Sequence, residues 1–271
     1  MDRNIGVIGT GVMGSALMKG IIQSGLIPAS RVFCFDANLQ RFEDAARKYG
    51  AVKTASSSEL AEKSDIIILA VKPYQINNVL ESIKSRITGN KTIVSIAAGV
   101  SLKQCEDIIG GDKKVVRAMP NTPLQVGEGM TLLSFNKNVG SAEKTEIKAI
   151  FECAGKAEEL EESLMNEVIA LTSSSPAYVF MFIEAMSDAA VQSGIPRDLS
   201  YRLAAQAVLG SAKMVLETGK HPGELKDQVC TPAGTTIEAV AALEKNHFRS
   251  SVMEAMQACT KKAMEMSKRY A

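Results

Sequence analysis

The feature that most constrains the fold is a glycine-rich turn close to the amino terminus. Residues Ile5–Ile8 form a short apolar segment typical of a buried strand, the turn follows at once, and a helical pattern continues to Ser24. A strand that turns through three glycines into a helix is typical of dinucleotide-binding domains. The first turn of such a helix offers free amides and a positive dipole end to a pyrophosphate. The residues that we predict at this cofactor site are Gly9, Thr10, Gly11, Val12, Met13 and Gly14.

The first half of the chain repeats the strand–helix alternation of a doubly wound sheet. Short apolar segments such as Ile66–Ala70 alternate with helical patterns such as Leu39–Tyr49. Continuous apolar strands are typical of a parallel sheet that is covered by helices on both faces. Later strands are expected at Met130–Phe135, as an antiparallel edge, and at Lys156–Leu160, as a last edge strand. These patterns predict an α/β fold, with a Rossmann-type doubly wound sheet over residues 1–162.

Asp36 stands at the end of the second predicted strand, Val32–Phe35. An acidic residue at this place usually accepts hydrogen bonds from the adenosine ribose, which favours NAD over NADP. Arg41 is close enough in sequence to offer a counter-charge to a 2′-phosphate, although an exposed helix face is the commoner place for such an arginine. On these residues alone the choice between the two cofactors stays open.

Three further loops follow predicted strands at the side of the sheet where ligands bind in open α/β folds. The first is Val71-Lys72-Pro73, in which the lysine either contacts a ligand or is simply solvated. The second, Ala97-Ala98-Gly99, has side chains small enough for a flat ring to approach the backbone, or for ordinary close packing. The third, Met119–Pro123, is made rigid by its two prolines.

Composition and charge argue against several classes of function. The 31 lysines and arginines balance 30 acidic residues, so the chain offers no basic field for nucleic acid or an anionic membrane. The longest apolar runs, around Ile66–Val71 and Ile93–Val100, are too short to span a bilayer, and the chain opens without a recognisable signal segment. Five scattered cysteines and two histidines indicate reduced thiols and no metal site. We therefore expect a cytoplasmic protein with no nucleic-acid or membrane partner.

From Leu164 onward the pattern is helical throughout, which predicts an all-α domain over residues 163–271. The helix after Pro176 is apolar on all sides over Ala177–Ile183, so it should be buried all round. A chain of this length buries such a helix most easily against a second copy of itself. We therefore expect a homodimer, or a larger homo-oligomer built from dimers.

A segment of small and hydroxyl-bearing residues, Thr231–Thr236, opens the predicted helix Ile237–Glu244. Free first-turn amides, hydroxyl donors and the positive end of a helix dipole suit a carboxylate ligand. An ordinary helix cap is the commoner use of such a segment.

Six segments stand out along the chain: IGVIGTGVMG at the start, AVKP at 70–73, SIAAGV at 95–100, RAMPNTP at 117–123, SPAYVF at 175–180 and KDQVCTPAGTTIEAVAALE at 226–244. Together they resemble the Δ1-pyrroline-5-carboxylate reductase family, which makes proline. The last segment is close to the family signature and is far more specific than the glycine turn. The resemblance runs in order through essentially the whole chain.

The resemblance implies a nucleotide domain, a helical dimerisation domain that interlocks with a second subunit, and NAD(P)H-dependent reduction of a cyclic imine to L-proline. It makes NADP(H) the preferred cofactor, while Asp36 keeps NAD(H) possible. Further residues expected at the cofactor are Ala70, Val71, Lys72, Pro73, Ala97, Met119 and Pro120. Residues expected to bind the substrate are Lys226, Ala233, Gly234, Thr235 and Asn121, and those expected to act in catalysis are Thr236 and Thr231.

Other functions are compatible with parts of the sequence. A related imine reductase or a 3-hydroxyacid dehydrogenase pairs a similar nucleotide domain with helices, but the second half offers no clear candidate for the lysine base of the hydroxyacid enzymes. A nucleotide-sensing homologue without turnover is a further alternative, against which the near-intact Thr231–Thr236 segment argues. Family members often have glycines where this chain has Ser173-Ser174-Ser175, so backbone approach at that point can differ.

Overall fold

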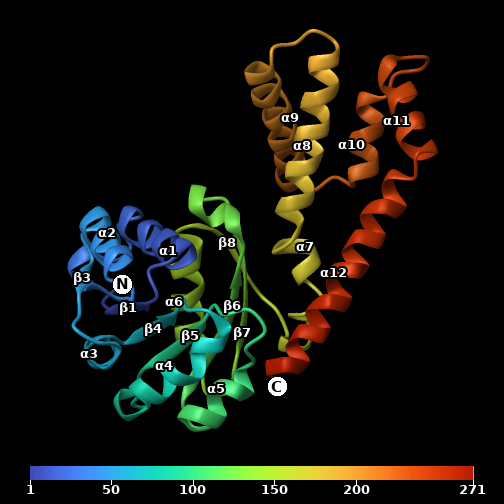
Figure 1. Cartoon of the computed structure of the whole chain (residues 1–271). Helices are drawn as coiled ribbons and strands as arrows, with labels where there is room; N and C mark the ends of the chain where they lie inside the picture. The colour runs from blue at the N-terminus through green and yellow to red at the C-terminus, as the bar shows by residue number, and fades with distance from the viewer. Residues whose placement is uncertain (271) are drawn as a thin grey trace. The chain divides into compact units, whose positions relative to one another are not determined.

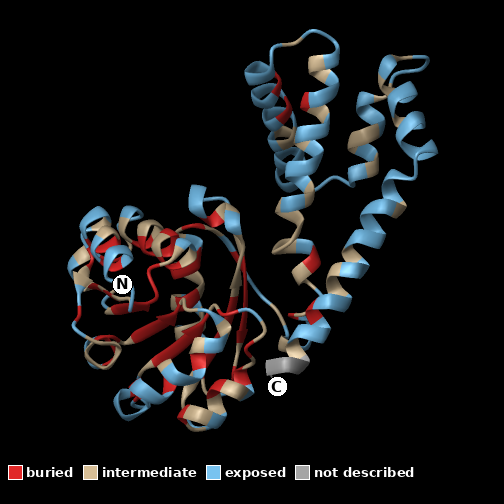
Figure 2. Ribbon diagram, in the orientation of Figure 1, coloured by how far each residue is buried: buried red, intermediate tan, exposed pale blue. Residues whose placement is uncertain are grey.

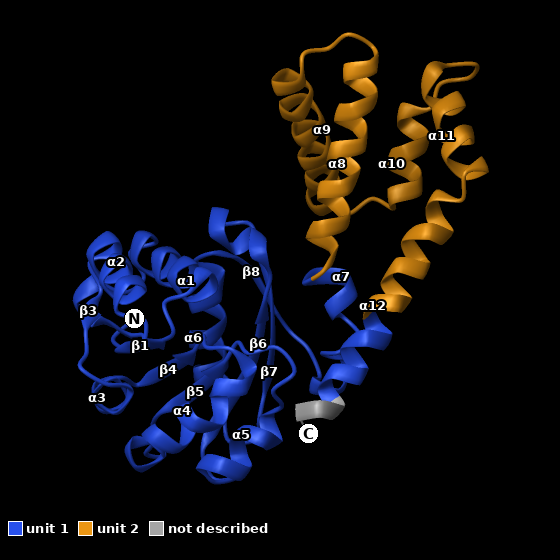
Figure 3. Cartoon of the chain, viewed as in Figure 1, with its two compact units in different colours: residues 1–173, 260–271 blue, residues 174–259 orange. Residues whose placement is uncertain are grey.

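The computed structural model describes residues 1–270, and the chain divides into two compact units (Figure 3). Unit 1 comprises residues 1–173 and 260–271, and unit 2 comprises residues 174–259. The first unit therefore continues past residue 162 to Ser173 and takes up the end of the last helix.

Unit 1 is built on an eight-stranded sheet with the order β3-β2-β1-β4-β5-β6-β7-β8 (Figure 1). The first six strands pair in parallel, β7 pairs antiparallel to β6, and β8 pairs parallel to β7. The strand order reverses at β1, where a crevice at the carboxyl ends of the strands is expected. The strands are β1 (Ile5–Ile8), β2 (Val32–Phe35), β3 (Val52–Lys53), β4 (Ile66–Leu69), β5 (Thr92–Ser95), β6 (Lys114–Pro120), β7 (Gly129–Phe135) and β8 (Gly155–Glu159).

Helices cover both faces of this sheet, so the buried strands lie between two apolar clusters (Figure 2). Within β4, Ile66 and Ile68 belong to one cluster, whereas Ile67 and Leu69 belong to the other, because alternate side chains of a strand point to opposite faces. The predicted doubly wound α/β fold is confirmed. The helices of unit 1 are α1 (Val12–Gln23), α2 (Leu39–Tyr49), α3 (Ser57–Lys63), α4 (Ile76–Ile83), α5 (Leu102–Ile109), α6 (Ser141–Glu152) and α7 (Ile169–Thr172).

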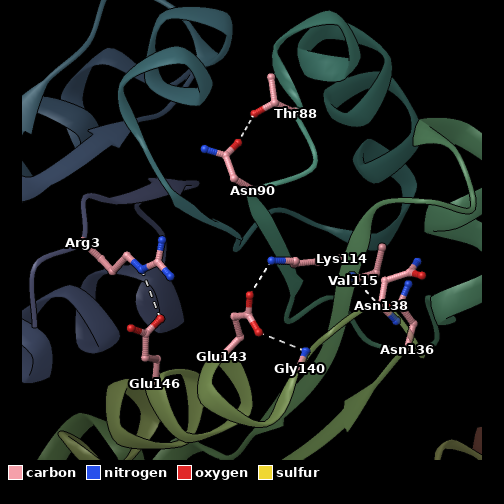
Figure 4. A network of polar contacts seen from close by, with 10 residues as sticks. All are labelled: Arg3, Thr88, Asn90, Lys114, Val115, Asn136, Asn138, Gly140, Glu143 and Glu146. Atoms are coloured by element: carbon pink, nitrogen blue, oxygen red, sulfur yellow. Dashed lines mark hydrogen bonds and ion pairs between the residues drawn. The ribbon is translucent and has the colours of Figure 1, made fainter.

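The end of the sheet at which the parallel strands begin carries ion pairs and hydrogen bonds (Figure 4). Lys114, at the start of β6, pairs with Glu143 of α6, and the other carboxylate oxygen of Glu143 accepts a hydrogen bond from the Gly140 amide. Arg3, just before β1, pairs with Glu146 at 3.1 Å. These contacts bind α6 to the sheet and stabilise its first turn.

Unit 2 is helical throughout. Its helices are α8 (Ser175–Gln192), α9 (Arg197–Thr218), α10 (Pro222–Val229), α11 (Thr235–Lys245) and the first part of α12 (Phe248–Tyr270). Helices α8 and α9 form a hairpin in which the buried hydroxyls of Ser187 and Ser200 lie 2.6 Å apart. Within the described residues 174–259, Ala204 is the one other buried residue, so this unit encloses no apolar core of its own.

Some elements differ from the prediction. The two-residue strand β3 and helix α5 were not predicted, although α5 buries Leu102, Cys105 and Ile109 on one face. Strand β7 is antiparallel as expected, but it lies inside the sheet because β8 covers its free side.

One segment also corrects the statement that the apolar runs are too short to span a bilayer. Residues Ile169–Gln192 are long and apolar enough to cross a membrane, by length and composition. A single helix of this kind is weak support for a membrane span, because its apolar surface suits contact with another protein chain equally well.

Candidate active site

A pocket of about 970 Å³ opens in unit 1 at the carboxyl ends of the parallel strands. It is lined by the glycine turn after β1, by the loop after β2, by the start of the loop after β5 and by the segment between β4 and α4. The predicted cofactor residues that it brings together are Gly9, Thr10, Gly11, Val12, Met13, Asp36, Ala70, Val71, Lys72, Pro73 and Ala97. Gly14, Met119 and Pro120 are not among the lining residues, and their contact with a cofactor stays a prediction.

The glycine turn leaves room for a ligand on one side only. At Gly14 a Cβ atom would lie 2.0 Å from the Gly9 carbonyl oxygen, whereas at Gly11 it would meet nothing within 4 Å. Helix α1 begins directly after Gly11 with no side-chain cap and no acidic residue in its first turn. The first-turn amides are therefore available to an anion such as a pyrophosphate. The turn fits a dinucleotide.

Asp36 fixes the second loop of the pocket through its carboxylate. Its Oδ2 atom accepts hydrogen bonds from the Thr10 amide at 2.6 Å and the Thr10 hydroxyl at 3.1 Å, and its Oδ1 atom accepts one from the Asn38 amide at 2.8 Å. A negative charge is thereby held at the pocket wall. The guanidinium of Arg41, which also lines the pocket, has no hydrogen-bond or ion-pair partner among the described residues.

Sequence reasoning missed several lining residues. Asn38, Ser57 and Gln75 contribute polar side chains to the pocket, and Tyr74 lines it with 73% of its surface exposed. Tyr74 and Gln75 could have been predicted from the sequence, because they directly follow Pro73 in a loop that was already expected at the cofactor.

Asn121 follows β6 and contacts the backbone of unit 1. Its Nδ2 atom donates a hydrogen bond to the Thr172 carbonyl oxygen at 2.9 Å, and its Oδ1 atom accepts one from the Met130 amide at 2.8 Å. These two bonds connect the loop after β6 to β7 and to α7. The predicted contact of Asn121 with the substrate stays a prediction.

In unit 2, the residues Thr231–Gly234 form a tight turn before α11. The Gly234 amide donates to the Thr231 carbonyl oxygen at 3.0 Å, and Ala233 adopts a φ of 56°, an uncommon conformation for alanine. Helix α11 then begins at Thr235 with no side-chain cap. Among the side chains that the structure describes, up to residue 267, the hydroxyls of Thr231, Thr235 and Thr236 find no hydrogen-bond partner. The loop thus combines unused hydroxyls with free amides at a helix N-terminus.

Lys226 lies on α10, shortly before this loop in the sequence. Its ammonium group donates a hydrogen bond to Asp227, which raises the pKa of Lys226 and keeps it charged. Its contact with the substrate stays a prediction.

Neither a metal centre nor an ionised buried thiol is found among the described residues. Among the described residues, no group of three His, Cys, Asp or Glu side chains is placed to hold a metal ion. Burial raises the pKa of Cys34 to about 11 and that of Cys105 to about 12, so both thiols are protonated at neutral pH.

Comparison with known proteins identifies the family. Residues 162–266 match the family described as pyrroline-5-carboxylate reductase dimerisation, and residues 4–99 match the family described as NADP oxidoreductase, coenzyme F420-dependent. The pyrroline-5-carboxylate reductase of Escherichia coli strain K12 is 47% identical over 99% of this chain and 100% of its own length. The chain belongs to the pyrroline-5-carboxylate reductase family.

Solved structures of the family extend the match to the fold. A pyrroline-5-carboxylate reductase from Coxiella burnetii has a TM-score of 0.92, with 33% identity and 98% of both chains covered. The pyrroline carboxylate reductase of Plasmodium falciparum, solved with NADP bound, has a TM-score of 0.85 with 35% identity, again over 98% of both chains. Members of this family are NAD(P)-dependent oxidoreductases that act on a C=N bond. The resemblance seen in the sequence is confirmed.

Proposed function

We propose that this chain reduces Δ1-pyrroline-5-carboxylate to L-proline with NAD(P)H. The observation that carries the proposal is the uncapped start of α11, with the unused hydroxyls of Thr231, Thr235 and Thr236 beside it. This loop lies in the segment that resembles the family signature most closely. A carboxylate on a small cyclic substrate is the anion that such a site suits.

The cofactor would be held by unit 1. When bound, NAD(P)H supplies the hydride, so the protein has to bind and orient the reactants. The first-turn amides of α1 would hold the pyrophosphate, to which Gly11 leaves the backbone open. The segment Ala70–Pro73 and Ala97, with Met119 and Pro120, would hold the rest of the cofactor.

We propose NADPH as the preferred cofactor, with NADH also accepted. The support for NADPH is the relative with NADP bound and the guanidinium of Arg41 in the pocket. Asp36 favours NADH, because a fixed carboxylate repels the 2′-phosphate of NADPH. The ratio of activity with NADPH to activity with NADH will therefore depend on the balance between the Arg41 and Asp36 charges.

In unit 2, the amides around Ala233–Thr235 hold the substrate carboxylate, and the ammonium group of Lys226 adds a positive charge nearby in the chain. A cyclic imine can carry its own proton near neutral pH, so the chain has no proton to deliver. The Thr236 hydroxyl accepts a hydrogen bond from the protonated ring nitrogen and donates one to it after the positive charge is lost. We propose that the Thr231 hydroxyl also forms a hydrogen bond with the substrate, beside Thr236.

We further propose that residues 163–271 form the dimerisation and substrate domain after a cofactor domain of residues 1–162, and that the active form is a homodimer or an assembly of dimers. The support is the match of residues 162–266 to the dimerisation family and the exposed apolar surface of unit 2. A reducing compartment such as the cytoplasm agrees with the five free cysteines.

The purified protein tests this function directly. We expect oxidation of NAD(P)H with Δ1-pyrroline-5-carboxylate, at different rates with the two cofactors. Oxidation with a 2-methyl-3-oxo acid alone would instead identify a 3-hydroxyacid dehydrogenase. Cofactor binding without turnover of either substrate would identify a nucleotide-sensing protein.

A further inference from the structure

A buried arginine outside the cofactor pocket contacts the segment that leads out of the sheet. Arg117 lies in the middle of β6, and only 8% of its side chain is exposed. Its Nη1 atom lies 3.3 Å from Glu162 Oε1, and its Nη2 atom donates a hydrogen bond to Asn166 Oδ1 at 3.2 Å. Because a buried charge is costly unless it is paired, both partners are needed to keep Arg117 in this position.

The same oxygen of Glu162 also holds the start of a helix. Glu162 Oε1 accepts a hydrogen bond from the Leu102 amide at 2.7 Å, and Leu102 is the first residue of α5. A carboxylate is favourable at the start of a helix because the dipole is positive there. Leu102 directly follows the loop Ala97–Ser101, and Ala97 and Ala98 line the cofactor pocket. One carboxylate oxygen of Glu162 therefore contacts both β6, through Arg117, and the start of α5, directly after the pocket loop.

A second contact fixes the far end of the same segment. We call residues 161–173 the connecting segment, because unit 1 passes into unit 2 at its end. Asn121, directly after β6, donates its hydrogen bond to the carbonyl oxygen of Thr172 in this segment. Strand β6 and the loop after it thus hold the connecting segment near its beginning and near its end.

We propose that Arg117 and Glu162 are positioning residues for hydride transfer. They keep the pocket loop Ala97–Ser101 and the connecting segment in one arrangement, and they do so without contact with substrate or cofactor. Hydride transfer needs the reacting atoms in close alignment, and a displacement of about 1 Å can lower the rate about 100-fold. The kinetic part of this proposal rests on the proposed reductase function.

The test compares this pair with a second ion pair on the same strand. Glu162→Gln keeps an acceptor for Leu102 but removes the charge, and Arg117→Met removes the guanidinium. The matched controls are Glu143→Gln and Lys114→Met, because both side chains are partly buried and Lys114 lies where β5 and β6 begin, whereas the pocket loop follows the end of β5. We expect kcat at saturating substrate to fall about 10- to 100-fold in the first two variants. In the controls kcat should change less than about twofold, even where Tm falls by a similar amount.

Hydrogen exchange gives a readout that does not depend on turnover. Glu162→Gln should speed amide exchange in residues 98–106, and the Glu143→Gln control should not. Wild-type kcat and KM in Glu162→Gln, with only Tm lowered, would overturn the proposal, as would unchanged exchange in residues 98–106.

If Arg117→Met does not fold, Asn166→Ala serves in its place, because it removes one partner of Arg117 and leaves the ion pair intact. It should lower kcat and speed exchange in residues 98–106, with a fall in Tm no larger than that of the control variants, and unchanged kcat and exchange would overturn the proposal. A wild-type protein without reductase activity would contradict the proposed function. Amide exchange in residues 98–106 and the Kd of NAD(P)H, each compared between wild type and Glu162→Gln, would then still decide whether Glu162 holds the pocket loop. Unchanged values of both would show that it does not.

Discussion

The two units of the molecule bury their apolar residues in different ways (Figure 2). Unit 1 encloses two apolar clusters, one on each face of its sheet. In unit 2 the side chains of Phe180 and Met181 are 63% and 69% exposed, and Leu209 is 54% exposed. Apolar helices of this kind are stable in water only when another surface covers them. Unit 1 therefore has its own core, whereas unit 2 depends on a partner, for which we propose a second copy.

This difference separates the two binding sites that we propose. The pocket proposed for the cofactor lies within the unit that has its own core, and the Thr231–Thr236 loop proposed for the substrate lies in the other unit. We therefore expect cofactor affinity to survive loss of the dimer and reductase activity to be lost with it.

The largest effect is expected from a charge on the exposed face of unit 2. Met181→Asp places a carboxylate where the proposed subunit contact excludes water, at a cost of about 4 kcal/mol or a roughly 1,000-fold higher dimer Kd. Sedimentation should then find a monomer without reductase activity. Leu39→Asp is the control for assembly, because Leu39 is 74% exposed on unit 1 and should accept the charge without loss of the dimer. A Met181→Asp protein that stays dimeric and active would contradict the proposed interface.

The next largest effect tests the pocket of unit 1. Gly11→Val places a side chain where the pyrophosphate approaches and removes about two hydrogen bonds to charged oxygens, which predicts a Kd for NAD(P)H at least roughly 100-fold higher. Its Tm should stay close to wild type, because a Cβ at Gly11 meets nothing within 4 Å. Gly89→Val, also in open space, is the matched control and should bind normally. Normal binding by Gly11→Val would show that the cofactor site is elsewhere.

A smaller effect is expected from the substrate loop of unit 2. Thr236→Ala removes one hydrogen bond to a charged group, worth about 1.5–3 kcal/mol, so kcat/KM for the imine should fall roughly 10- to 150-fold. The Kd of NAD(P)H should not change, and Thr236→Ser should restore most of the activity. If the variant keeps its turnover, the Thr236 hydroxyl has no part in the reaction, whatever its effect on Tm.

The smallest effect concerns the cofactor preference of unit 1. Asp36→Ser removes the fixed charge that repels a 2′-phosphate, so the ratio of kcat/KM with NADPH to that with NADH should rise about tenfold. Arg41→Ala should lower the same ratio. Dimer mass and substrate KM should stay constant in both variants. A ratio that does not respond to either change would place the adenosine ribose away from these two side chains.

The sequence by itself determined the features that depend on neighbouring residues. The glycine turn, the alternation of apolar strands with helices, and the small-residue loop before α11 are all local, because a turn or a helix start is set by a few adjacent side chains. The family resemblance added the order of these segments along the chain. Helix α5 was missed although its signals were local too: Ser101 caps it, and Leu102, Cys105 and Ile109 form its buried face.

Only the tertiary structure decided which distant residues meet. The family resemblance implied a substrate contact for Asn121, which stays a prediction, and the structure adds that its side-chain amide binds the backbone at Thr172 and Met130. The pairing of Arg117 with Glu162, and of Glu162 with Leu102, depends on how the chain returns to β6 after β8. No local pattern encodes such contacts, because they form only when folding closes long loops and desolvates both partners.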